Sequence, residues 1–178
     1  MNNCLIHVCC LPCLLGEIDN LKELNLNYSL FFSNSNIDSI KEFNRREIEL
    51  KKLNYPIIID KYDHNDWLNS LKVLKKDPKE YPENSDRCLI CLKYRLKRAF
   101  EYAKENNFQY VFSTLSISLY KDTSFLNKLG LDFEKKYGVK YLTIKLSPKK
   151  WKETSLKKSK EIDCYRQKYC GCEFSKKS

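Results

Sequence analysis

Residues 87–113 read RCLICLKYRLKRAFEYAKENNFQYVFS, and this stretch contains the clearest helix of the chain followed by a short apolar run. Spacings of three and four residues place one set of side chains on a single helical face: Cys88, Cys91, Leu92, Arg95, Leu96, Ala99, Phe100 and Ala103. That period predicts an amphipathic helix over residues 87–106. The run at 108–113 is short and has no helical period, and it predicts a buried strand.

The rest of the chain repeats this alternation of strand and helix. Further strands are predicted at residues 4–9, 28–33, 56–60 and 139–144, and helices at 14–26, 40–53, 66–74 and 123–137. Ser39 and Glu42 match a capping box that opens the second of these helices, and residues 75–86 read as a loop. Strands that alternate with helices predict an α/β fold, a Rossmann-like parallel sheet with helices on both faces.

In such a sheet, ligands bind beyond the carboxyl ends of the strands. Polar and sulfur-containing residues follow three of the predicted strands: Cys9, Cys10 and Cys13 after the first, Asp60 and Asp63 after the third, and Ser113 and Thr114 after the fourth. We therefore expect the functional site at this edge.

Length and composition limit the class of protein. A chain of 178 residues with 42% hydrophobic and 31% charged residues fits one domain, residues 1–178, with an ordinary core. Its apolar runs fall short of the roughly 20 residues that cross a bilayer, and residues 1–13 lack the pattern of a signal peptide. These features predict a soluble, cytoplasmic protein.

The charge is concentrated at the end of the chain. The formal net charge is +10, and residues 140–178 contain 12 Lys and Arg against four Asp and Glu. Lys149, Lys150, Trp151 and Lys152 combine cations with an aromatic ring, a pattern that suits phosphate contacts and base stacking in RNA binding. The alternatives are a solvated helix face and a generally basic proteome.

Nine cysteines are the stronger clue. Seven of them form three groups: Cys9, Cys10 and Cys13; Cys88 and Cys91; Cys170 and Cys172. Cys4 and Cys164 stand apart and are expected to be buried thiols. Cys88 and Cys91 lie one helical turn apart, so both sulfurs can face one metal. Cys9 and Cys10 could complete a four-thiolate site from across the crevice.

Two questions stay open on spacing alone. Four thiolates suit structural zinc or an iron–sulfur cluster, although adjacent cysteines and a ligand pair on a long helix depart from the usual zinc pattern. Cys170-Gly-Cys172 could form a strained, labile disulfide that cycles with its dithiol, could hold a second metal, or could be two further structural thiols.

Four motifs together resemble one family. They are His7-Val-Cys-Cys-Leu-Pro-Cys13, Arg87-Cys-Leu-Ile-Cys-Leu-Lys-Tyr-Arg-Leu96, Phe112-Ser-Thr-Leu-Ser-Ile-Ser118 and Tyr165-Arg-Gln-Lys-Tyr-Cys-Gly-Cys-Glu-Phe-Ser175. In this order they resemble the cobalamin-independent epoxyqueuosine reductases, the QueH family, along essentially the whole chain. Departures fall in the loops, at Leu11, residues 83–86, Leu115 and Leu119, and leave the cysteines in place.

The resemblance implies an adenine-nucleotide-hydrolase-like fold and the last step of queuosine biosynthesis, in which the epoxide of epoxyqueuosine in the tRNA anticodon is reduced. It implies a [4Fe-4S] cluster on Cys9, Cys10, Cys88 and Cys91, an additional iron ion, and a redox-active pair at Cys170 and Cys172. Cys13 matches a further candidate ligand. The substrate is then tRNA, the electron donor is not identified by the sequence, and the basic segment 148–178 is expected to cover the site.

Proton donors for such a reaction could be Tyr120, Asp63 or His7, with Asp63 the residue we single out. Two other classes remain as rivals. One is a zinc-bound, non-catalytic RNA-binding module. The other is a sulfur-inserting tRNA enzyme of the same fold, which would carry a Ser-Gly-Gly-x-Asp-Ser phosphate loop where this chain has Cys9-Cys10-Leu-Pro-Cys13. We therefore expect no ATP hydrolysis.

Overall fold

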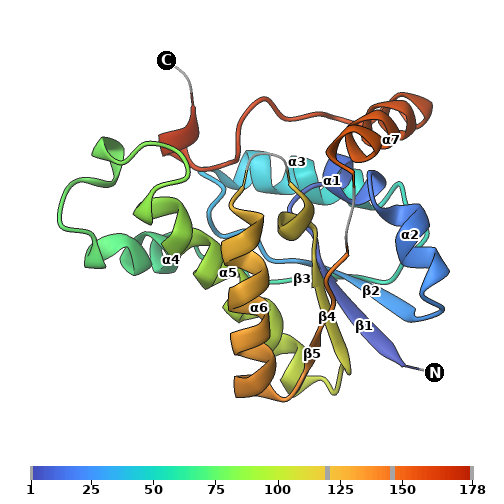
Figure 1. Ribbon diagram of the computed structural model, residues 1–178. Helices are drawn as coiled ribbons and strands as arrows, with labels where there is room; N and C mark the ends of the chain where they lie inside the picture. The colour runs from blue at the N-terminus through green and yellow to red at the C-terminus, as the bar shows by residue number, and fades with distance from the viewer. Residues whose placement is uncertain (1, 119–120, 145–146, 177–178) are drawn as a thin grey trace.

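A computed structural model describes residues 2–118, 121–144 and 147–176 of the chain. These residues form a five-stranded sheet of β1 (Asn3–His7), β2 (Asn27–Phe32), β3 (Ile57–Ile59), β4 (Tyr110–Ser113) and β5 (Lys140–Tyr141). The strands are parallel and their order is β3-β2-β1-β4-β5 (Figure 1). The order reverses direction between β1 and β4, which creates the switch point where α/β sheets bind ligands.

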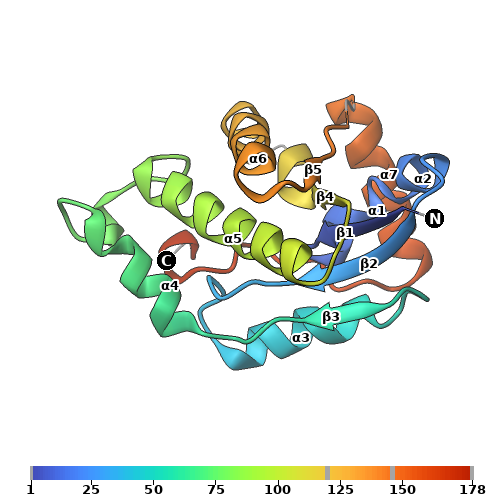
Figure 2. The ribbon, with the colours of Figure 1, turned by 90° about the horizontal axis from the view of Figure 1, so that it is seen from below.

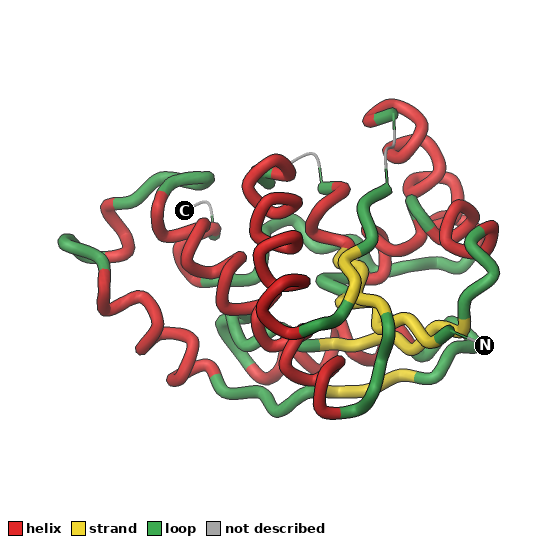
Figure 3. Tube along the Cα trace, turned by 60° about the horizontal axis from the view of Figure 1, so that its bottom comes forward, coloured by secondary structure: helices red, strands yellow, loops and turns green. Residues whose placement is uncertain are grey.

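Helices cover the sheet on both faces, as the sequence predicts (Figures 2 and 3). Their bounds are α1 (Leu11–Leu15), α2 (Ile18–Glu23), α3 (Ile40–Leu50), α4 (His64–Ser70), α5 (Asp86–Glu105), α6 (Thr123–Tyr137) and α7 (Pro148–Glu161). Short 3-10 turns occupy Leu71–Val73, Pro78–Glu80, Thr114–Ile117 and Glu173–Ser175.

Side-chain alternation along the strands divides the core in two. In β1, Cys4 and Ile6 face a cluster that includes Leu14 of α1, Phe43 of α3 and Trp151 of α7. Leu5, between them, faces a second cluster formed largely by apolar residues of α5 and α6. Because successive strand residues point to opposite faces, a sheet buried on both sides requires such an uninterrupted apolar run.

The helix predicted over residues 14–26 is wrong in its bounds, because the chain forms two short helices, α1 and α2. Helix α1 begins earlier, and Pro12 fits its first turn because the missing amide hydrogen is not needed there. The helix ends at Gly16, where the Trp151 ring lies so close that a Cβ atom would be 2.4 Å from its Nε1. The hydrophobic pattern of residues 14–26 cannot predict a contact with residue 151.

Other elements differ mainly at their ends. The strand predicted over 139–144 is limited to Lys140–Tyr141, which pair with Tyr110 and Val111. Ser39 caps α3 by accepting a hydrogen bond from the Glu42 amide, while the Glu42 carboxylate binds Arg46 instead of closing the box. No helix in the described part of the chain is both long and apolar enough to span a bilayer.

Candidate functional site

The first group of thiols lies at the switch point, directly after β1. Cys10 is the extended N-cap of α1, and Cys13 lies on the first turn of that helix. The sulfurs of Cys9, Cys10 and Cys13 all lie within 4.8 Å of one another, and those of Cys9 and Cys10 are 3.8 Å apart. Thr114 is the first residue after β4. Its hydroxyl oxygen accepts a hydrogen bond from the Cys9 amide at 3.0 Å and lies 3.3 Å from the Cys9 sulfur. Both strands of the switch point therefore fix this group.

The three thiols do not ionise alike. Hydrogen bonding with Cys10 and Cys13 and the positive charge of Arg95 hold the pKa of Cys9 well below its usual value. Interactions with Cys10 and Cys9, together with burial, raise the pKa of Cys13 well above its usual value. Cys9 therefore loses its proton more readily than Cys13, and a metal ion would be needed to ionise all three thiols.

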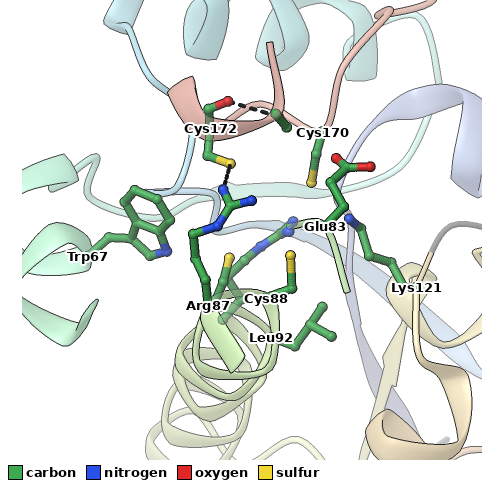
Figure 4. Close-up of a pocket in the computed structure, with 11 residues that line it drawn as sticks. Trp67, Glu83, Arg87, Cys88, Leu92, Lys121, Cys170 and Cys172 are labelled. Atoms are coloured by element: carbon green, nitrogen blue, oxygen red, sulfur yellow. Dashed lines mark hydrogen bonds between the residues drawn. The ribbon is translucent and has the colours of Figure 1, made fainter. Parts of the chain in front are cut away.

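The second group of thiols surrounds a hollow between the start of α5 and the end of the chain. Cys88 and Cys91 come from the first turns of α5, and Cys170 and Cys172 come from the segment after α7. In Figure 4 the sulfurs of Cys88 and Cys170 point into the same space. Burial raises the pKa of Cys91 to about 12 and also raises that of Cys172. These thiols are neutral unless a cation displaces their protons.

Three cationic side chains line the same hollow: Arg87, Arg95 and Lys121. Arg87 donates to the Cys172 sulfur at 3.5 Å and to the Tyr81 carbonyl oxygen at 3.0 Å. Burial lowers the pKa of Lys121, but its interactions with Cys170, Cys88 and Glu83 outweigh burial and raise the pKa above its usual value. The hollow is therefore a positively charged, sulfur-lined space.

The charge of Arg95 favours the ionised form of Cys9 and of Cys91. Among the described residues, the sequence-predicted ligands are divided between two groups: Cys9 and Cys10 lie with Cys13, and Cys88 and Cys91 line the hollow. Cys170 and Cys172, predicted as a redox pair or second-metal ligands, lie with Cys88 and Cys91.

The residues present fit an anionic metal–sulfur group. Arg87 Nε, Arg95 Nε and Trp67 Nε1 are buried N–H donors without a hydrogen-bond partner among the described residues, and all three side chains line the hollow. Buried donors normally have acceptors. Thiolate and sulfide sulfurs accept such bonds, and a negatively charged group would offset the buried guanidinium charges.

Helix α3 fixes the position of Cys170 and Cys172. Arg46, which is 3% exposed, donates to the carbonyl oxygens of Cys170 at 3.0 Å and of Tyr169 at 3.4 Å, while its Nε binds Glu42 at 2.7 Å. Gly171 has φ +130°, and a Cβ atom there would lie 3.1 Å from Ile37. Only glycine readily fits this turn between the two cysteines.

Helix α7 carries the predicted RNA-binding residues, and one of them is placed differently from the expectation. Trp151 is 5% exposed, packs against Gly16 and donates from Nε1 to the Cys13 carbonyl oxygen at 3.4 Å. Its ring anchors α7 to α1 and has no free face for a base, which corrects the stacking role. Lys149, Lys150 and Lys152 are exposed. In Figures 1 and 2, α7 lies beside α1 and α2, whereas the C-terminal end lies on the side of the molecule that carries α4.

Among the residues that the structure describes, two of the candidate proton donors, Asp63 and His7, do not contribute to the lining of the hollow. Asp63 caps α4, accepts from the Asp66 amide at 3.0 Å and pairs with Lys61 at the surface, and it does not contribute to the described lining of the hollow. His7 lies 2.9 Å from Ser113 Oγ and 3.1 Å from the Ser33 carbonyl oxygen, and burial lowers its pKa to about 4. It is a neutral link between strands. Tyr120 lies outside the described residues.

Several residues of the site belong to no recognisable sequence motif. Arg46, Trp67 and Lys121 gave no local signal, because their partners are distant in sequence. Arg95 did give one, since an arginine on an otherwise apolar face must find a buried counterpart.

A Rossmann-like sheet with one group of thiols at its switch point, and a second group around a hollow lined by buried cations, defines a thiol-rich protein whose side chains suit a metal or redox centre. Residues 4–178 match the family model of epoxyqueuosine reductase QueH, and the chain belongs to this family. Similar proteins include the epoxyqueuosine reductases QueH of Streptococcus pyogenes serotype M1, Acinetobacter baylyi and Thermotoga maritima. They are 32%, 33% and 32% identical over 97%, 96% and 98% of this chain, which spans 70%, 79% and 91% of their lengths.

Proposed function

We propose that the chain reduces the epoxide of epoxyqueuosine in tRNA, the last step of queuosine biosynthesis. The observation that carries this proposal is the gathering of Cys88, Cys91, Cys170 and Cys172 around one hollow next to Arg87, Arg95 and Lys121, with Cys9, Cys10 and Cys13 grouped directly after β1. Membership of the QueH family, whose relatives bear the name of this activity, supports it.

Cys9, Cys10, Cys88 and Cys91 are proposed to hold a [4Fe-4S] cluster, with Cys13 available as a further ligand and a second iron beside the cluster. Support comes from the short sulfur–sulfur distances, from the unpartnered N–H donors and from thiols whose protons only a cation would displace. Iron would supply single electrons and a Lewis acid for the epoxide oxygen. Cobalamin and ATP have no part in this proposal.

The reaction needs two electrons and two protons, which convert the epoxide to an alkene and release water. A dithiol at Cys170 and Cys172 can supply both, since its oxidation to a disulfide releases two electrons and two protons. An electron donor, not identified by sequence or structure, would then reduce the disulfide. Arg46 and Gly171 support this role because they hold the pair at the hollow.

Lys149, Lys150 and Lys152 are proposed to bind backbone phosphates of the tRNA. They are exposed on a helix that Trp151 fixes against α1, so their positions relative to Cys13 are set by packing. A helix that is fixed by a buried tryptophan and presents exposed lysines suits the binding of backbone phosphates. A tRNA substrate also makes the cytoplasm the expected location.

The experiment is anaerobic purification followed by iron, sulfide and zinc analysis, visible absorption, and an assay with tRNA that contains epoxyqueuosine. We expect a brown protein with about four iron and four sulfide per chain, or more iron if the second site is filled, and formation of queuosine in the tRNA. A colourless zinc protein that binds tRNA without converting it would instead show a non-catalytic RNA-binding module.

A further inference from the structure

Arg95 is a buried charge without a carboxylate. It is 2% exposed, and its guanidinium donates to the side-chain oxygen of Asn34. Its Nε has no partner, and it forms no ion pair, within the part of the chain that the structure describes. A buried guanidinium with one neutral acceptor is costly, because desolvation of a charge normally requires an opposite charge.

Arg98, one turn further along α5, is paired with a carboxylate, as a partly buried arginine usually is. It donates to the two oxygens of Asp60 at 3.2 and 2.8 Å, and Ser33 donates to the same carboxylate at 2.6 Å. Arg95 is more deeply buried than Arg98 and lacks such a partner. The protein chain therefore leaves the charge of Arg95 to be offset by something else.

Sulfur is what surrounds Arg95. The side chain lines the hollow together with Cys88, Cys91, Cys170 and Cys172. Asn34 holds the guanidinium there, since its amide nitrogen donates at 2.9 Å to the carbonyl oxygen of Val8, the residue after β1. The arginine is thus fixed at the sulfur-lined hollow.

We propose that Arg95 is a positioning residue that binds the anionic metal–thiolate group of the site and raises its reduction potential. The inference rests on the proposed function. Four thiolates around an iron–sulfur core carry net negative charge, which increases by one on reduction. A fixed positive charge in contact with it stabilises the reduced state more than the oxidised state. Hydrogen bonds to the sulfurs act in the same direction.

The test is the midpoint potential of the reconstituted protein, followed by visible absorption or electron paramagnetic resonance during an anaerobic redox titration. Arg95→Gln removes the charge and should lower the ratio of reduced to oxidised cluster at a fixed solution potential by about tenfold or more, which corresponds to about 59 mV for one electron. Arg95→Lys keeps the charge and should remain closer to the wild type. The matched control Lys93→Gln removes one charge from the exposed face of α5 and should leave the potential unchanged.

Asn34→Asp keeps Arg95 and tests the same idea if Arg95→Gln does not fold or bind iron. A carboxylate beside the guanidinium offsets its charge, so the potential should fall, whereas a purely structural Asn34–Arg95 contact would survive with an unchanged potential. Unchanged potential in either iron-loaded variant overturns the inference. A wild-type protein without a cluster would instead overturn the proposed cofactor, which separates the two failures.

Discussion

The Arg46 guanidinium donates a hydrogen bond of 3.0 Å to the carbonyl oxygen of Cys170, across 124 positions of sequence. The same side chain is paired with Glu42 on its own helix and reaches Tyr169 as well. All three nitrogens of the guanidinium therefore have partners, and the side chain joins α3 to the turn that carries Cys170 and Cys172. The proposed redox pair is positioned by a helix that packs on the opposite face of the sheet from α5.

Arg46→Gln should release this turn. Loss of the cation leaves Glu42 half-buried and the two carbonyl oxygens without a donor, which should lower the free energy of unfolding by about 2–4 kcal/mol. Faster modification of Cys170 by a thiol reagent and lower activity should accompany it, while cluster content stays the same. Arg45→Gln is the control, because Arg45 is exposed and stacks on Tyr165. Equal thiol reactivity in both variants would contradict a positioning role.

Cys88→Ser and Cys91→Ser should each abolish the cluster and the activity, since a hydroxyl is a poor substitute for a thiolate ligand. Iron and sulfide analysis with visible absorption gives the result directly. Cys164→Ser is the matched control, because Cys164 is half-buried near Glu49 and lies outside both groups of thiols. Full iron and sulfide in either α5 variant would rule out the ligand assignment.

Much of the fold could be predicted from the sequence because the deciding signals are local. The apolar face of α5 and the short runs of β1 and β4 reflect periodicities that burial on both sides of a sheet requires. The need for glycine at position 16 could not be predicted, since the ring that leaves no room for a Cβ atom there belongs to Trp151, more than a hundred residues away. Local sequence patterns cannot predict such a long-range contact.

The candidate site also contains residues that local sequence patterns predicted and residues that they could not predict. The spacing of Cys88 and Cys91 predicted that both would face one site, and both line the hollow, whereas Cys9 and Cys10 form a separate group with Cys13. That the two groups share one cluster stays a prediction. The exposure of Trp151 was predicted incorrectly, because composition cannot tell an anchoring aromatic from a stacking one. Lys121 and Arg46 depend wholly on tertiary contacts.

Replacing Lys149, Lys150 and Lys152 with Gln should weaken tRNA binding and flatten its dependence on salt. Each lost phosphate contact should reduce the log–log slope by somewhat under one unit. The measurement is the affinity for tRNA at several salt concentrations. The charge-matched control replaces Lys128, Lys135 and Lys136 of α6, which are exposed on another helix. A slope that changes as much in the control would show that only net charge matters.

Glu17 gives a prediction about pH. Burial raises the pKa of this carboxyl to about 7 from an ordinary 4.5, and its Oε2 has no hydrogen-bond partner among the described residues. The folded state therefore binds a proton that the unfolded state has released between these values, so stability falls as pH rises through this window. Glu17→Gln should match the wild type near pH 4.5 and be more stable by about 1 kcal/mol above pH 7. Thermal unfolding from pH 4.5 to 8.5 tests this, with exposed Glu23→Gln as control.

Cys170 and Cys172 should be needed for turnover and not for the main cluster. The structure places both thiols at the hollow, where Arg87 lies 3.5 Å from the Cys172 sulfur and Lys121 faces Cys170. Cys170→Ser and Cys172→Ser proteins should stay brown with near-normal iron and sulfide, because Cys9, Cys10, Cys88 and Cys91 remain. They should nevertheless fail to convert epoxyqueuosine in tRNA.

The two versions of this role separate in the double variant. If the pair only stores electrons, a strong low-potential reductant should partly restore conversion, because electrons can then reach the site without a dithiol. If the pair holds the second iron, no reductant should help, and the wild type should contain more iron than the double variant. Full activity without any added reductant would contradict both versions. Cys170 and Cys172 would then serve to close the chain over the hollow, held by Arg46 and the turn at Gly171.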